Sequence, residues 1–119
     1  METTTNRSKR SALALLGLAR RAGALERGTG STRRAVKDGR ARLVLLAQDA
    51  SEAQRNKVLK LLRHRGTPRV ILGSRAELGA AVGSAPVSAV AVTEAGFASR
   101  LANQLGANAG TNDQTEKRR

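Results

Sequence analysis

Residues 26–39 combine a turn that holds two glycines, Gly28 and Gly30, with closely spaced basic side chains, a pattern suited to binding an anion. Their sequence is Glu-Arg-Gly-Thr-Gly-Ser-Thr-Arg-Arg-Ala-Val-Lys-Asp-Gly. Glycine reaches backbone dihedrals that other residues avoid, and it lets a partner approach the main chain closely. A helix that begins after such a turn points unpaired N–H groups at the partner, which favours an anion at that place. The basic side chains on the same helix suit a phosphate backbone, whereas a solvated turn with scattered surface charge is the alternative interpretation.

The net charge of the 119-residue chain is +13 and is concentrated in residues 1–73. These residues hold 17 Lys and Arg against 5 Asp and Glu, whereas residues 74–119 hold 5 against 4. Such an uneven distribution indicates a polyanionic partner. Phe97 is the only aromatic residue, so the chain cannot build a platform on which splayed bases stack. We therefore expect binding by backbone contact, charge and shape, with Phe97 in the core.

Several other classes of site are excluded by composition. The chain has no cysteine, and its one histidine, His64, lies between Arg63 and Arg65, where the neighbouring cations oppose metal binding. Asp49 follows an apolar strand, but no second carboxylate nearby is free to hold a metal or accept phosphate with it, because Glu52 belongs to a capping box; Asp49 is better explained as a helix cap. The glycine turn lacks the Gly-Lys-Ser/Thr end of a nucleotide-binding loop. We therefore expect no metal, no cofactor and no enzyme; a small α/β enzyme is the weakest alternative, since it would need an acidic or histidine constellation.

The N-terminal residues lack the apolar segment of a signal peptide, and no apolar run approaches the length of a membrane span. We expect a cytoplasmic protein that does not bind membranes.

Periodicity and turn residues predict helices that alternate with strands. The expected helices are 8–21, 31–38 with Gly39 as a left-handed stop, one from the capping box Asp49-Ala50-Ser51-Glu52 to Gly66, a short one that begins with the capping box at residues 74–77, and one from Thr93 to Leu105. The expected strands are 43–47, 69–72 and 87–92, with residues 24–27 extended. This order predicts one α/β sandwich domain over residues 8–105 with a mostly buried sheet. A polar arm is expected at residues 1–7 and a disordered tail at residues 106–119.

Four segments, in this order and spacing, resemble the kink-turn RNA-binding family of ribosomal proteins, and most of all its small bacterial YlxQ-like branch. The similarity extends from about Leu13 to Leu105. The segments are Leu-Gly-Leu-Ala-Arg-Arg-Ala-Gly at 16–23, the block at 28–39, Leu-Val-Leu-Leu-Ala-Gln-Asp-Ala-Ser at 43–51, and Ala-Val-Thr-Glu-Ala-Gly-Phe-Ala at 91–98. The resemblance implies a single-domain, three-layer α/β/α sandwich with a small mixed sheet. It also implies binding to a sharply bent RNA helix at its sheared G·A pairs.

The resemblance assigns roles to individual residues. Gly28 matches the turn glycine of the family, and Arg27 matches a basic residue that touches phosphate. Arg34 falls where the family has a lysine that reaches into the RNA groove. The loop at residues 85–87 aligns with an apolar loop that covers a looped-out nucleotide, although from the residues alone this loop is simply the start of a strand.

Two positions depart from the pattern of the strongest binders, which carry Asn and then Glu after the turn. Here these positions hold Gly30 and Ser31. Without the amide and the carboxylate, base-edge readout is lost and mostly phosphate contact remains. The expected RNA-binding residues are Arg27, Gly28, Thr29, Gly30, Ser31, Arg33, Arg34, Lys37, Ala85, Pro86 and Val87.

The expected partner is structured RNA, in particular ribosomal RNA and with it the ribosome, bound by a monomer. The alternative is a ribosome-associated module that uses the same fold to bind protein.

Overall fold

A computed structural model of the chain describes residues 6–106. In chain order its elements are α1 (Asn6–Arg21), β1 (Leu25–Arg27), α2 (Thr29–Lys37), β2 (Leu43–Leu46), α3 (Glu52–Leu62), β3 (Arg69–Ile71), α4 (Arg75–Ala81), β4 (Ala89–Val92) and α5 (Ala95–Leu105). Apart from residues 6, 7 and 106, the expected N-terminal arm and C-terminal tail lie outside the described residues.

The four strands form one mixed sheet in the order β1-β4-β2-β3. β4 is antiparallel to both β1 and β2, whereas β2 and β3 are parallel. Every residue of the two central strands is buried, as expected from their continuous apolar sequences. Residues 24–27 were expected to be extended, and residues 25–27 of them form β1, a short strand at the edge of the sheet.

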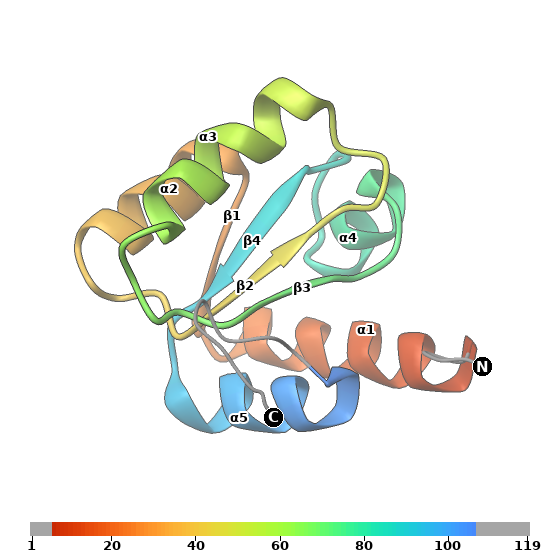
Figure 1. The fold of residues 1–119 in the computed structure, drawn as a ribbon. Coiled ribbons are helices and arrows are strands. Elements are labelled where there is room, and N and C mark those ends of the chain that lie inside the picture. The colour runs from red at the N-terminus through yellow and green to blue at the C-terminus, as the bar shows by residue number, and fades with distance from the viewer. Residues whose placement is uncertain (1–5, 107–119) are drawn as a thin grey trace, which may run out of the picture.

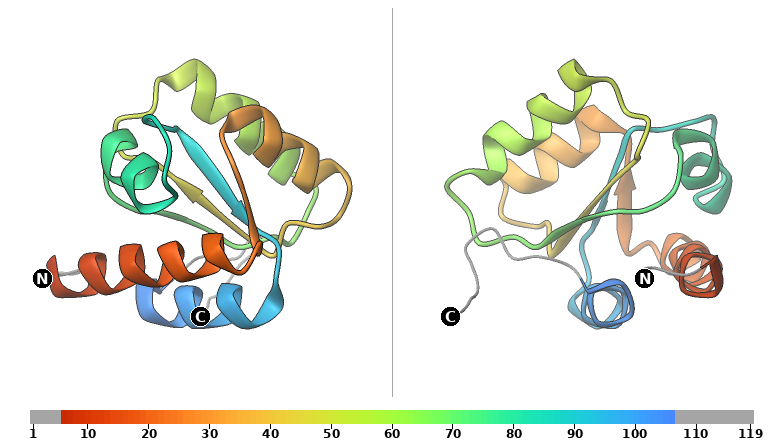
Figure 2. Two further views of the ribbon diagram at one scale, coloured as in Figure 1. Left: turned by 180° about the vertical axis from the view of Figure 1, so that it is seen from behind. Right: turned by 45° about the vertical axis from the view of Figure 1, so that its right-hand side comes forward.

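Helices cover both faces of the sheet, as Figure 1 and the two views of Figure 2 show. α2 and α3 lie side by side on one face, and α1 and α5 lie on the other, with α4 beside α1. The expected three-layer α/β/α sandwich is confirmed. Within residues 6–106, no helix has both the length and the apolar composition needed to cross a membrane.

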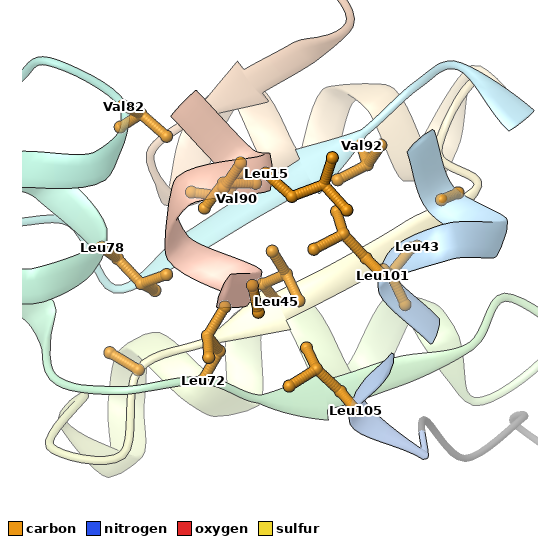
Figure 3. Close-up of a cluster of buried hydrophobic side chains, with 14 of the residues drawn as sticks. Leu15, Leu43, Leu45, Leu72, Leu78, Val82, Val90, Val92, Leu101 and Leu105 are labelled. Carbon is orange, nitrogen blue, oxygen red and sulfur yellow. The ribbon is translucent and has the colours of Figure 1, made fainter. Parts of the chain in front are cut away.

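The alternation of side chains along the strands divides the core into two clusters. Leu43 and Leu45 of β2 point to the side of α1, α4 and α5, where they meet Leu15, Leu72, Leu78, Leu101 and Leu105 (Figure 3). Val44 and Leu46 point to the other face and pack with residues of α2 and α3. β4 contributes only alanines to this second face, which leaves room for α2 against the sheet. The position of α2 is therefore set by its buried residues Ala35 and Val36.

Two of the expected helix ends are confirmed in detail. Ser74 caps α4, its hydroxyl accepting the N–H of Glu77 at 3.1 Å while the Glu77 carboxylate accepts the N–H of Ser74 at 2.9 Å. Gly39 follows α2 with φ = 75°, the left-handed conformation expected of a helix stop.

Two other predicted caps are wrong. α3 is capped by Ser51 alone, whose hydroxyl accepts the N–H of Gln54, so the expected box from Asp49 to Glu52 does not form. α5 is capped by Glu94 instead of Thr93, because the carboxylate of Glu94 reaches the N–H of Phe97 at 2.9 Å. In each case the capping side chain lies one or two residues later than expected, where the distance to the N3 amide is right.

Candidate nucleic-acid interface

Gly28 makes the turn between β1 and α2. Its N–H donates to the carbonyl of Ala89 at 2.8 Å, which continues the pairing of β1 with β4, and its carbonyl accepts the N–H of Thr32 at 2.9 Å, which begins α2. Its dihedrals, φ = 97° and ψ = 156°, lie in a region that only glycine occupies readily. A Cβ at this position would meet no atom within 4 Å. The requirement for glycine here is therefore one of backbone conformation and not of space.

Gly30 is not part of the turn, contrary to the sequence-based expectation. It lies in the first turn of α2, and it is not among the glycines with positive φ. A Cβ at Gly30 would also meet nothing within 4 Å. Because the bond from Thr32 to Gly28 starts the helix two residues earlier than predicted, Thr29 and Gly30 are helical. The turn needs one glycine, and position 30 can accept other residues.

The N-terminus of α2 is open to an anion. Gly28 has no side chain to cap the helix, and no acidic residue lies in the first turn. The first N–H groups of a helix have no acceptor within it and carry partial positive charge. Arg34 and Lys37 are exposed farther along α2, and Arg33 is half-buried with its Nε buried and without a hydrogen-bond partner. α2 therefore combines backbone donors at its N-terminus with three cationic side chains along its length, of which Arg34 and Lys37 lie in the last turn.

The apolar loop lies beside the glycine turn, although some sixty residues separate them in the sequence. Pro86 and Val87 line a hollow of about 500 Å³ together with Gly28 and Thr29; its other lining residues are Asp49, Ser51, Gln54, Arg75 and Ser88. The N–H of Val87 donates to the carbonyl of Arg75 at 3.1 Å, which holds the loop against the start of α4. Two segments far apart in the sequence thus line one hollow.

Ala85, the remaining loop residue on the expected list, does not line this hollow. It is exposed, and its backbone packs directly on Gly79, where any side chain would collide with it.

The hollow also contains polar side chains that the sequence did not identify as part of a site. Asp49, expected to cap α3, instead accepts the backbone N–H of Arg75 at 2.7 Å and so joins the end of β2 to the start of α4. Ser51 and Gln54 come from the start of α3. The one feature of the sequence that could have indicated a site at Asp49, Ser51 and Gln54 was their position after a central strand, because α/β folds place functional groups at the carboxyl ends of strands.

Arg27 does not line the hollow beside the loop. Its Nη1 donates to the carbonyl of Val82 at 3.0 Å. Arg27 and Ser31 line a second hollow, of about 400 Å³, together with Arg20, Leu25 and Glu26. Gly30, Arg33, Arg34 and Lys37 line neither hollow. Thr29 and Ser31, in the first turn of α2, therefore line different hollows, whereas Arg34 and Lys37 lie in its last turn.

No metal site accompanies this surface: residues 6–106 contain no group of three His, Cys, Asp or Glu side chains that could hold a metal ion.

Residues 10–102 match the sequence pattern of the ribosomal protein L7Ae/L30e/S12e/Gadd45 family. The chain belongs to this family. The resemblance that the sequence suggested is thereby confirmed.

Individual relatives agree with the L7Ae/L30e/S12e/Gadd45 assignment. The chain is 38% identical over 91 residues to the RNA-binding protein YlxQ of Bacillus subtilis, a match that covers 76% of this chain and 91% of the relative. It is similar to a solved structure of a protein of unknown function from Bacillus halodurans C, with a TM-score of 0.75 and 35% identity over 80% of this chain and 96% of the other. A 15.5kD RNA binding protein from Giardia lamblia has a TM-score of 0.71 at 23% identity, covering 86% of this chain and 90% of the other, and so shares the fold.

Proposed function

We propose that this protein binds structured RNA without catalysing a reaction, using the Gly28 turn, the N-terminus of α2 and the loop at residues 85–87. The observation that carries the proposal is the shared hollow, in which Gly28 and Thr29 face Pro86 and Val87. Membership of the L7Ae/L30e/S12e/Gadd45 family supports it, as does the 38% identity to a bacterial RNA-binding protein.

The arrangement suits a bent RNA backbone. Phosphates approach the open N-terminus of α2, where the backbone donors and the helix dipole favour negative charge. Arg34 and Lys37, exposed on the same helix, reach the adjacent groove and backbone. Pro86 and Val87 offer a small apolar surface to a nucleotide that has left the stack. A kink-turn, and ribosomal RNA that contains one, presents such a nucleotide beside two backbones.

The recognition of sheared G·A pairs is weak in this proposal. Gly30 lies in the first turn of α2 and has no side chain, and the short hydroxyl of Ser31 replaces the carboxylate that the strongest binders place there. Most of the binding free energy therefore comes from phosphates, which position the protein without reading base identity.

Fluorescence anisotropy with three RNAs tests the proposal. They are a kink-turn, the same RNA with its G·A pairs replaced by Watson–Crick pairs, and a plain duplex of equal length. We expect the kink-turn to bind most tightly, by a modest margin. Equal binding of all three RNAs would contradict recognition of the bend. Retention of acidic proteins but not of structured RNA in a pull-down would favour a protein-interaction module instead.

A further inference from the structure

Two arginine side chains line one hollow on the α1 side of the Gly28 turn. Arg20 comes from the last turn of α1, and Arg27 ends the edge strand β1. Both side chains are exposed, and both line the hollow of about 400 Å³ that also includes Ser31 of α2. Two cations from different elements therefore share one hollow beside the N-terminus of α2.

Both guanidinium groups lie against the turn after α4. Arg27 donates to the carbonyl of Val82, the C-cap residue of α4, at 3.0 Å. A Cβ built on the next residue, Gly83, would lie only 2.7 Å from Cζ of Arg20. The Arg20 guanidinium thus occupies space that is open only because residue 83 has no side chain.

The positive charge in this hollow is not neutralised by the described residues. Glu26 also lines the hollow, but its carboxylate receives Nη1 of Arg40 at 3.0 Å. The ion pairs described within residues 6–106 use Lys9 and Arg40 as their cations, and none uses Arg20 or Arg27. Two guanidinium groups that share one hollow and form no ion pair with a described carboxylate favour an anion between them.

We infer that Arg20 and Arg27 together bind a backbone phosphate of the RNA on the α1 side of the Gly28 turn. This inference rests on the proposed function and extends its surface to α1. Guanidinium groups hold phosphate oxygens with two parallel hydrogen bonds, and two of them can share one phosphate. Since Ser31 lines this hollow and Thr29 lines the other, the RNA backbone crosses the first turn of α2 from one hollow to the other.

The salt dependence of binding to a kink-turn RNA tests this assignment in the full-length protein. Arg20→Gln removes the charge, and Arg21→Gln is the matched control, because Arg21 is exposed on the same helix and lines neither hollow. One lost phosphate contact makes the slope of log K against log salt less steep by about 0.7–0.9. That change corresponds to about a fivefold to eightfold loss of affinity at about 0.1 M salt, which vanishes toward 1 M. Arg21→Gln should change affinity less than about twofold, and Arg20→Lys should restore the slope.

The outcomes separate this inference from the proposed function. If the wild-type protein does not bind the RNA, the proposed function itself is wrong. If it binds but Arg20→Gln keeps the wild-type slope, or loses no more than Arg21→Gln, the phosphate site at Arg20 is wrong and the proposed function stands. A purely structural role for Arg20 would lower the melting temperature of Arg20→Gln and leave the slope unchanged, which also overturns the inference. All binding is measured well below the melting temperature of each variant.

Discussion

Gly28 and Gly30 are identical residues two positions apart, but the structure makes different demands on them. Gly28 has φ = 97° and ψ = 156°, whereas Gly30 lies within α2. Neither has an atom within 4 Å of a potential Cβ, so steric collision does not distinguish them. The difference between the two sites is therefore purely conformational.

The two glycines should respond oppositely to alanine. Gly28→Ala should lower the free energy of unfolding by about 1–3 kcal/mol, because alanine is strained in this backbone region. Gly30→Ala should raise it by roughly 0.5–1 kcal/mol, because alanine is the better residue in a helix. Urea denaturation measures both. Equal losses for the two variants would contradict the assignment of the turn to Gly28 alone.

Gly30 and Ser31 set how well the protein can read base edges. The double variant Gly30→Asn/Ser31→Glu should widen the preference for an intact kink-turn over one without G·A pairs by on the order of 1–3 kcal/mol per restored group. The open surroundings of Gly30 accommodate the asparagine, and a glutamate in the first turn of α2 suits the helix dipole. The preference is measured as the ratio of the two dissociation constants.

The added negative charge of this double variant would by itself weaken nonspecific binding, so a gain on the intact kink-turn cannot come from charge. No gain would mean that positions 30 and 31 do not face the RNA.

At the scale of elements, the start of α4 carries a titratable cap. The Glu77 carboxylate accepts the backbone N–H of Ser74 and lies 3.2 Å from Nζ of Lys9, and together these contacts lower the pKa of Glu77 below its ordinary value of 4.5. Its stabilising effect is therefore full above that value and is lost as the pH falls through the lowered pKa of the folded state.

We expect Glu77→Gln to be less stable than the wild type near neutral pH and the difference to shrink as the pH falls below about 4.5. Thermal denaturation of both proteins across this pH range measures the difference. The other carboxylates titrate in both proteins, so their effects cancel in the comparison. A difference that stays constant down to about pH 3 would contradict a role for the ionised carboxylate.

Features encoded by neighbouring residues could be predicted from the sequence. The apolar runs of β2 and β4 predicted a buried sheet, and the spacing of Ser74 and Glu77 predicted the cap of α4. Asp49 could not be placed in the same way, because its partner, the N–H of Arg75, lies 26 residues away in the sequence. The meeting of Gly28 with Pro86 is equally nonlocal. The residues alone did not assign that loop a role; only the family resemblance did.

On the scale of the whole molecule, the sandwich places its charge unevenly. α1 carries five basic residues and α2 three, with no acidic residue in either helix, whereas α5, on the opposite face of the sheet from α2, carries Arg100 alone (Figure 1). If about five phosphates are neutralised, the slope of log K against log salt for RNA binding should be about −4 to −5. Titrations from low to physiological salt measure it, and a flat dependence would contradict binding dominated by phosphates.

The most direct measurement compares Arg34→Ala, on α2, with Arg100→Ala, on α5. Both arginines are exposed, and the two helices lie on opposite faces of the sheet. Binding to a kink-turn RNA should weaken by about 1–3 kcal/mol in Arg34→Ala if this side chain reaches base edges, and it should change little in Arg100→Ala. Equal losses in the two variants would show that the RNA does not select the face of α2, and would contradict the proposed interface.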